Sequence, residues 1–315
     1  MTLFSLFQVA MALLTAPYAH RATTLPTLSK YPELFDKGDI AAETTVTYLP
    51  DGRLVAITFG GRDIFIRDPF TAEIIKQIPT PSGIFMGTAL SSGGLLHVFG
   101  TTPLCDFEKP GSTIVHATID ADWKVSAPET VYTTPSNTNM CNLGITATPR
   151  GWVMSVETQL VTPGSYSPGI FFLIASDING AWTRTGVTAN IGSYIGSPKI
   201  RYSLERNEFF VTYLAQSGKT YYTTAAKMPS DLSAFIPFAG NASSPDVTAI
   251  IAPDTPADMI NTSDMTYVEY HGHVEGIYSD GNQATITHLR RFSYPGTVEQ
   301  FERKFFPIPS IVPPP

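Results

Sequence analysis

Five hairpins of one kind recur along this chain, and their recurrence limits the possible folds more than any other feature. Each has a polar start, an apolar strand, a turn with glycine or asparagine, and a second apolar strand. A single unit cannot bury its apolar faces alone, so neighbouring units must pack against each other. The hairpins span residues 41–61, 85–102, 141–158, 195–214 and 261–283, with turns at Asp51-Gly52, Gly93-Gly94, Arg150-Gly151, Arg206-Asn207 and His271-Gly272.

The segments between the hairpins supply candidate third and fourth strands. Residues 63–68, 112–119, 169–176 and 221–228 are candidate third strands, and segments such as 71–78 and 123–132 follow them. The spacing between turns approximates the repeat of about 40–50 residues of a four-stranded propeller blade, with insertions. The sequence therefore predicts an all-β fold, a five-bladed β-propeller over residues 23–307. A pair of β-sandwiches is the alternative, which explains the strands but not the recurrence.

The two ends of the chain are expected to lie outside the propeller. Residues 3–16 are almost wholly apolar but shorter than the about 20 residues that span a membrane. Small residues follow, so residues 1–22 are predicted to be a secretory signal peptide, with a buried helix as the alternative. Phe301 and Phe305 are four residues apart, which predicts a short closing helix over 298–306. The proline-rich residues 308–315 predict an extended tail.

Composition and charge narrow the class of partner. Only 15% of the residues are charged, the net charge is −7, and no cluster of Lys and Arg offers a face for a phosphate backbone. This pattern argues against nucleic acid as a partner. No second apolar segment reaches the length of a membrane span. We therefore expect a secreted, extracellular monomer that is free of the membrane after signal cleavage.

Two sequons and two cysteines agree with export. The sequons at Asn241 and Asn261 are candidate N-glycosylation sites. Cys105 and Cys141 are either a disulfide formed in an oxidising compartment or two buried thiols. Neither cysteine belongs to a CxxC or histidine spacing that binds zinc. We expect no metal and no cofactor, and no ligand set for an ion on the propeller axis is visible.

Several segments occur in the order found in a known class of enzymes. They are YPELFDKG, NTNMCNLGITATPRGWVMSVET, SPKIRYSLERNEFFVTYL, NTSDMTYVEYHGHVEGIYSDGNQ and YPGTVEQFERKFFP. Over residues 31–307 the chain resembles five-bladed β-propeller glycosidases, broadly related to family 43 glycoside hydrolases. The resemblance implies hydrolysis of furanosides or related sugars in a funnel on the propeller axis, by carboxylates from the inner strands.

The chain departs from the family 43 pattern at two points. Glu43-Thr44 stands where that family has an Asp-Pro whose aspartate is the general base, and Ile195-Gly196-Ser197-Pro198 replaces a Glu-Gly-Pro strand start. The leading hypothesis is a secreted glycoside hydrolase acting on a carbohydrate. The departures motivate the alternative of a non-catalytic carbohydrate-binding propeller, and a structural extracellular protein without a ligand is a third hypothesis.

Glycosidic cleavage needs two carboxyl groups, one to protonate the leaving oxygen and one to activate water or attack the sugar. The first strand of each blade lines the axis, so residues equally far before their turns lie at one level. Glu43, Asn142 and Asp264 lie eight or nine residues before their turn glycines, and Glu157 ends the returning strand of the third hairpin. We predict Glu157 as proton donor and Glu43 or Asp264 as base or modulator, provided that the register holds.

Other readings of these acids stay open. Asp264 could form an Asx turn, and Glu43 could be an ordinary strand start. Asp280 ends the fifth hairpin at the same level, although Asp280-Gly281 is more typical of a turn. Glu157 ends an apolar strand, where an acid is costly unless it is paired, and this favours a functional role.

Sugar binding calls for aromatic rings and amides at the same end of the strands. Tyr194 precedes the fourth inner strand and is the best stacking candidate, while Arg201 on that strand could hold a carboxylate ionised. The predicted substrate-binding residues are Asn142, Tyr194, Arg201, Asn261, Asn282 and Gln283, with Asn137 and Asn139 as further amides. We interpret His97 and His116 as core histidines, Trp152 and Trp182 as packing residues, and Glu269 as outward-facing or paired with His271 or His273.

Overall fold

The computed structural model describes residues 44–60, 63–80, 83–103, 111–134, 138–162, 165–190, 194–217, 220–237, 250–251, 261–282 and 286–306. The predicted signal peptide and proline-rich tail lie outside these residues and stay predictions. The same holds for the individual predictions on Glu43, Cys105, Asn137, Asn241 and Gln283. In the described part of the chain, no helix is long and apolar enough to cross a membrane.

The described chain is nearly all β, with one short helix. The first sheet contains β1 (Thr44–Tyr48), β2 (Leu54–Gly60), β3 (Asp63–Arg67) and β4 (Ile74–Pro79). The second contains β5 (Phe85–Ser92), β6 (Leu95–Thr102), β7 (Thr113–Ile119) and β8 (Glu129–Thr133), and the third contains β9 (Thr138–Thr148), β10 (Gly151–Thr162), β11 (Ser165–Ala175) and β12 (Thr183–Ala189). The largest contains β13 (Ile195–Ser203), β14 (Glu208–Ser217), β15 (Thr220–Pro229), β16 (Ile236–Pro237), β17 (Asn261–Tyr270), β18 (His273–Asn282) and β19 (Ile286–Pro295).

All five predicted hairpins are present, as β1–β2, β5–β6, β9–β10, β13–β14 and β17–β18. The backbone angles at two of the turns explain why glycine is found there. His271 and Gly272 have φ of 48° and 77°, and Gly93 and Gly94 have 58° and 81°. Positive φ at both central residues is the mark of a type I′ turn, whose twist matches that of the flanking strands.

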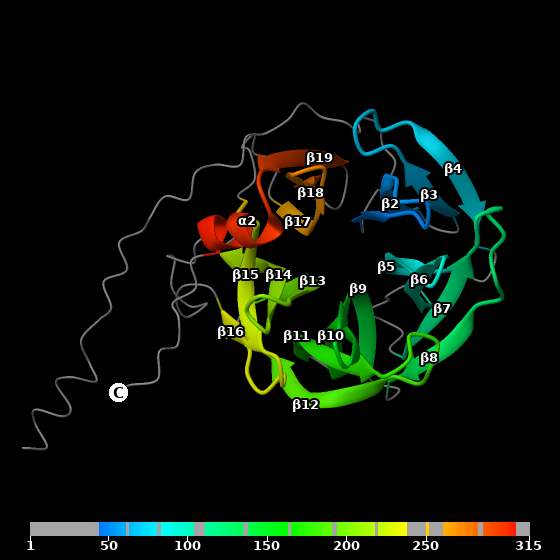
Figure 1. Ribbon diagram of the computed structural model, residues 1–315. Coiled ribbons are helices and arrows are strands. Elements are labelled where there is room, and N and C mark those ends of the chain that lie inside the picture. The colour runs from blue at the N-terminus through cyan, green and yellow to red at the C-terminus, as the bar shows by residue number, and fades with distance from the viewer. Residues whose placement is uncertain are drawn as a thin grey trace, which may run out of the picture.

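The first strands of the five hairpins lie around the middle of the molecule (Figure 1). Side-chain hydroxyls join some of the neighbouring first strands. Thr45 and Thr88 hydroxyls are 3.3 Å apart between β1 and β5, and Tyr202 N donates to Thr146 Oγ1 at 3.1 Å between β13 and β9. Val46 N donates to Thr266 Oγ1 at 2.9 Å, so the last hairpin meets the first.

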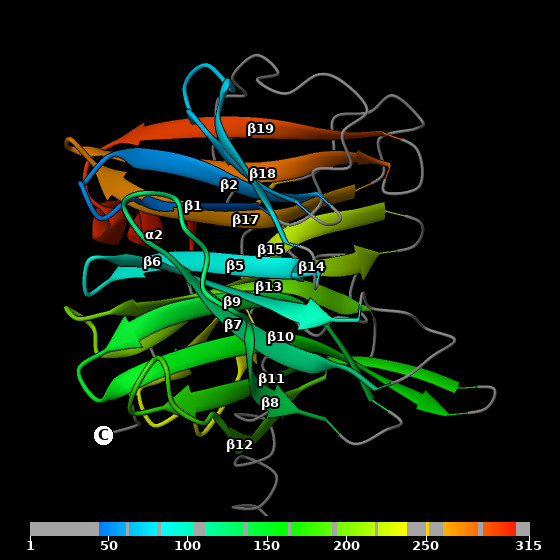
Figure 2. The same ribbon diagram turned by 90° about the vertical axis from the view of Figure 1, so that its right-hand side faces the viewer.

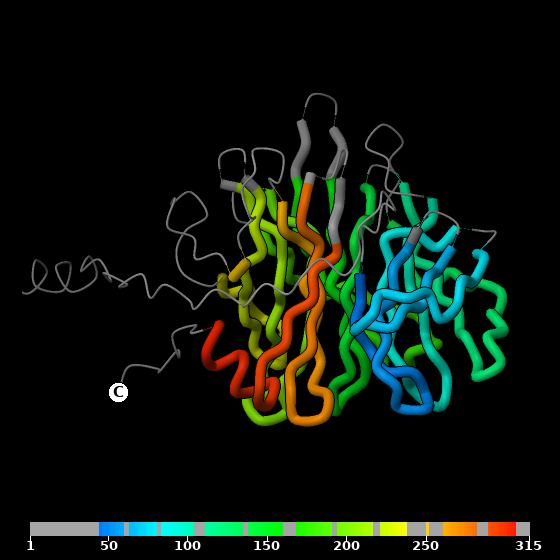
Figure 3. The backbone as a smooth tube through the Cα atoms, turned by 90° about the horizontal axis from the view of Figure 1, so that it is seen from above, coloured from blue at the N-terminus to red at the C-terminus, as the bar shows by residue number. Residues whose placement is uncertain are grey.

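The hairpin turns gather at one end of the molecule (Figures 2 and 3). We call this the turn end, and the opposite end, where β1, β5, β9, β13 and β17 begin, the mouth end. The five hairpins belong to only four hydrogen-bonded sheets, because β15 pairs in parallel with β17 at Tyr221 and Asn261. None of the described sheets closes on itself, and sheet pairing alone does not establish the predicted count of five blades.

The core lies between neighbouring sheets, and the predicted closing helix packs on its last part. That helix, α2 (Val298–Phe305), begins with a capping box between Thr297 and Gln300, which satisfies backbone N–H groups at its start. Phe301 and Phe305, predicted to share a face, are 0% and 3% exposed. They pack with Phe292 and Tyr294 of β19, as the sequence predicts.

Candidate functional site

Four of the inner strands carry a β-bulge near the mouth end. In each, two residues oppose one on the neighbouring strand: Met86 and Gly87 in β5, Cys141 and Asn142 in β9, Ser197 and Pro198 in β13, and Asp264 and Met265 in β17. Met86, Ser197 and Asp264 have φ of 50°, 45° and 55°. A bulge re-aims the side chains beside it, and positive φ at residues other than glycine is a strained conformation found often at functional sites.

The bulge in β9 lies opposite Glu157 on β10. The Glu157 carboxylate is 1% exposed and accepts four hydrogen bonds from uncharged donors. These come from Ser197 N at 2.8 Å, Asn142 Nδ2 at 2.8 Å, Tyr194 OH at 2.9 Å and Gln159 Nε2 at 3.2 Å. Burial raises the pKa of Glu157, and the four donors act in the opposite direction by favouring the ionised form.

A glycine makes this arrangement possible. A Cβ on Gly196 would lie 2.9 Å from both Cδ and Oε2 of Glu157 and 2.9 Å from Tyr194 OH. Any larger residue would therefore push the carboxylate or the phenol away. Gly196 thus leaves room for the carboxylate that reaches it from β10.

Asp264 occupies the bulge of β17 and is 3% exposed. Ser263 Oγ donates to its Oδ2 at 2.9 Å, and Lys199 Nζ lies 3.6 Å from its Oδ1. Lys199 is also buried, at 6% exposed, and donates to Leu143 O at 3.0 Å. Thr44 Oγ1 donates to the Asp264 carbonyl at 3.4 Å, which ties the start of β1 to this site.

Strand β13 connects the two carboxylates. Its Ser197 contacts Glu157 from the third sheet, and two residues later Lys199 approaches Asp264 on β17. Asn142 Nδ2 also donates to Ser197 Oγ at 3.0 Å. Glu157 and Asp264 therefore each contact β13 near the mouth end.

Two more predicted residues lie at this end. Tyr194 packs edge-on against Tyr221, with ring centroids 5.5 Å apart, and Tyr221 pairs with Asn261 in the sheet. Asn261 is only 4% exposed, and its glycosylation stays a prediction. The side chain of Asn282 is outside the described part, and Asn139 accepts a hydrogen bond from Gly111 N at 3.0 Å.

Asp280 and Arg201 take places that the sequence did not indicate. Asp280 lies within β18 rather than in a turn, is 1% exposed and accepts from Arg290 Nε at 3.1 Å. Arg201 points to the closing helix, where its Nε donates to Glu302 at 2.6 Å. Glu269 is exposed, in agreement with the outward-facing alternative, and accepts from Val298 N at 3.2 Å at the start of that helix.

Lys199 and Ser197 belong to the site but were missed by sequence reasoning, whereas Ser263 was part of the polar group expected at the start of the fifth hairpin. The available signal was a lysine directly after Pro198 near the start of an inner strand. Cys141, beside Asn142, is disulfide-bonded. Because Cys105 is outside the described residues, its pairing with Cys141 stays a prediction. In the part of the chain that the structure describes, no cluster of three His, Cys, Asp or Glu side chains could hold a metal.

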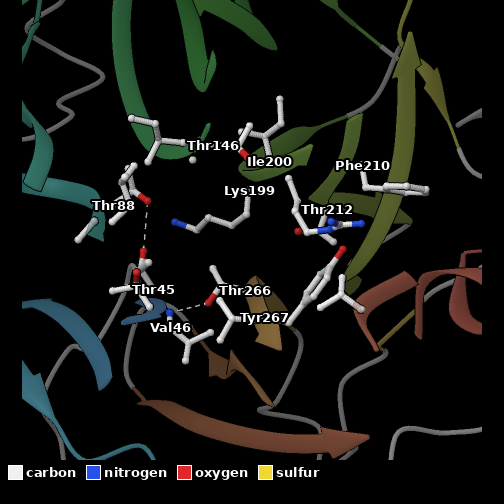
Figure 4. Close-up of a pocket in the computed structure, with 18 of the residues that line it drawn as sticks. Thr45, Val46, Thr88, Thr146, Lys199, Ile200, Phe210, Thr212, Thr266 and Tyr267 are labelled. Carbon is white, nitrogen blue, oxygen red and sulfur yellow. Dashed lines mark hydrogen bonds between the residues drawn. The ribbon is translucent and has the colours of Figure 1, made fainter. Parts of the chain in front are cut away.

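A cavity of about 610 Å³ extends from Lys199 toward the turn end (Figure 4). Neither Glu157 nor Asp264 lines it. Its hydroxyl groups are engaged with neighbouring strands, since Thr266 accepts from Val46 N and Thr212 donates to Met265 O at 2.9 Å. We therefore place the candidate chemistry at the mouth side of Lys199, not in this cavity.

Comparison with known proteins concerns the fold. No protein-family model and no curated protein matches this chain. A glycoside hydrolase superposes with a TM-score of 0.63 at 13% identity, over 94% of this chain and 97% of that one. The α-L-arabinofuranosidase of Podospora anserina, in complex with cellotriose, gives 0.59 at 10% identity, over 87% and 99%. An exo-1,5-α-L-arabinanase from a bovine ruminal metagenomic library gives 0.55 at 12%, over 82% and 95%. The chain thus has the propeller fold of these glycoside hydrolases.

Proposed function

We propose that this protein is a secreted, five-bladed glycoside hydrolase-like propeller that cleaves glycosidic bonds at its mouth end. The observation that carries the proposal is the pair of buried carboxylates, Glu157 and Asp264, on either side of β13. Two carboxyl groups in different environments are what acid and base roles require. The fold neighbours include an arabinofuranosidase and an arabinanase, which supports a furanoside or related sugar as substrate.

The environments assign the roles. Burial raises the pKa of Glu157, which favours a protonated acid that can donate to the leaving oxygen. Asp264 Oδ1 lies 3.6 Å from the ammonium of Lys199, and we assign Asp264 the role of base or nucleophile. Glu43, which precedes Thr44 in the sequence, stays a candidate for a second base. Tyr194, Asn142 and Asn261 would contact the sugar.

The test is hydrolysis of a panel of aryl furanosides and pyranosides. We expect turnover of at least one substrate by the wild type. Asp264→Asn should lose about 10²–10⁴-fold, the usual contribution of a positioned acid or base, and Glu157→Gln should lose as much on substrates whose leaving oxygen must be protonated. Glu205→Gln is the matched control, because Glu205 pairs with Arg303 on the exposed surface. Equal rates in all four proteins would contradict the assignment.

A non-catalytic carbohydrate-binding propeller is the second candidate. It is favoured by the enclosure of Glu157, whose carboxylate already accepts four hydrogen bonds. In that case a glycan array would give binding that Tyr194→Ala abolishes, while no member of the panel is hydrolysed.

A further inference from the structure

The cavity on the propeller axis takes no part in the proposed chemistry, and it opens at the turn end. Its lining residues on the side of Lys199, such as Thr45 and Met265, are buried. Toward the hairpin turns the lining becomes accessible, since Tyr48 is half-buried and Glu269 is exposed. The volume of about 610 Å³ lies within the range of about 300–1,000 Å³ that is typical of small-molecule sites. The cavity is therefore a pocket that a ligand can enter from the turn end.

The walls of this pocket favour a ligand with an apolar body. They are mostly apolar, with Ile145, Phe210 and Val268 among the side chains that form them. Two wall hydroxyls already bond to the backbone of neighbouring strands, because Thr212 donates to a carbonyl at 2.9 Å and Thr266 accepts from an N–H at 2.9 Å. A sugar needs polar partners for its many hydroxyls, so these walls suit a ring or a short alkyl chain better than a second carbohydrate.

The entrance carries an acid without a basic partner. Glu269 accepts from Val298 N at 3.2 Å and forms no ion pair in the part of the chain that the structure describes. The other acid of the lining, Glu299, pairs with Arg201 at 3.0 Å. Burial, and after it the Glu269 carboxylate, raises the pKa of Tyr48, so these two side chains lie within electrostatic range of each other. A carboxylate near an aromatic ring is a combination that binds organic ammonium groups, through charge and cation–π attraction.

We propose that this pocket binds a small organic ammonium compound, with its apolar body between the inner strands and its ammonium group at the entrance beside Glu269 and Tyr48. The distribution of charge sets this orientation. The basic side chain of Lys199 extends across the inner end (Figure 4), so the acid at the entrance is the favourable place for a positive group. Neither Glu157 nor Asp264 lines the pocket, and the proposal does not depend on the proposed glycosidase function.

The charge of the ligand is tested with 2-phenylethylammonium, 2-phenylethanol and phenylacetate, three phenyl compounds of similar size. In NMR titrations at neutral pH we expect the ammonium compound to bind the wild type about 10-fold more tightly than the alcohol, and phenylacetate to bind most weakly. In Glu269→Gln, which keeps an oxygen to accept from Val298 N, the ammonium compound and the alcohol should bind equally. Glu129→Gln is the matched control, because Glu129 is an exposed acid on β8 outside the lining, and it should keep the 10-fold preference.

The place of binding is tested by filling the entrance. Ala147 is exposed and lines the pocket, so Ala147→Trp should weaken binding of both the ammonium compound and the alcohol by about 10-fold or more. Ala127→Trp, at an exposed position outside the lining, should bind as the wild type does. Undiminished binding in Ala147→Trp overturns the proposal. Equal affinity of the wild type for the ammonium compound and the alcohol, or a preference that survives in Glu269→Gln, overturns it as well.

Discussion

Glu157 and Glu302 are both enclosed almost completely, at 1% and 0% exposed, but their partners differ in charge. Glu302 accepts from Arg201 Nε at 2.6 Å and from Tyr267 OH at 2.7 Å. Glu157 accepts only from uncharged donors. Burial raises the pKa of both carboxyls, but only Glu302 has a guanidinium to hold it ionised. Glu302, paired with a cation, fixes the closing helix. Glu157, which has only neutral donors, is the carboxyl that we propose as proton donor.

The largest effect on stability is expected where the ion pair is removed. Glu302→Gln leaves the partly buried Arg201 guanidinium with only one of its two carboxylate partners, Glu299 at 3.0 Å. Breaking one partner of a buried pair costs about 3 kcal/mol or more of unfolding free energy. Urea denaturation of Glu302→Gln beside Glu205→Gln, whose pair is exposed, measures the effect. A loss of similar size in both would remove the contrast between buried and exposed pairs.

A second variant displaces the Glu157 carboxylate without removing it. Gly196→Ala puts a methyl group 2.9 Å from its carboxylate, and a displacement of about 1 Å can lower a rate by about 10²-fold. We therefore expect kcat/KM of Gly196→Ala to fall by up to about 10²-fold, with a smaller loss of unfolding free energy than in Glu302→Gln. Gly186→Ala is the control, because a Cβ there meets nothing within 4 Å. Wild-type activity in Gly196→Ala would mean that the position of Glu157 does not matter.

A third buried pair consists of two histidines. His97 Nδ1 and His116 Nε2 are 2.9 Å apart with stacked rings, and burial, with His97 as a further cause, lowers the pKa of His116 to about 4. The unfolded chain, with an ordinary histidine pKa of about 6.5, binds more protons below that pH. The free energy of unfolding should be highest above about pH 6.5 and should decrease as the pH falls toward 4. Thermal unfolding of the wild type and of His116→Gln between about pH 4 and pH 6.5 tests this expectation. The same change of Tm with pH in both proteins would contradict it.

Local chemistry made much of the fold predictable. Turns such as Gly93-Gly94 and His271-Gly272 demand positive φ and are visible in the sequence, and the level of Glu157 and Asp264 follows from counting back to them. The bulges were not predictable, because β9, β13 and β17 are buried on both faces near the mouth end and show no alternation that an extra residue would interrupt. Asp280 was misread for a related reason, since Asp-Gly is typical of a turn unless a distant Arg290 pairs with the acid. The contacts of Arg201 and Lys199 depend on segments far away in the sequence.

The role of Glu157 as proton donor is tested most directly by measuring how the rate of hydrolysis depends on the leaving group. Glu157 acts as proton donor in this account, so Glu157→Gln should hydrolyse aryl glycosides with acidic phenols nearly as well as the wild type. Its rates should then fall steeply as the pKa of the phenol rises. A loss of equal size for every leaving group, or no loss for any, would contradict the assignment of Glu157 as the acid.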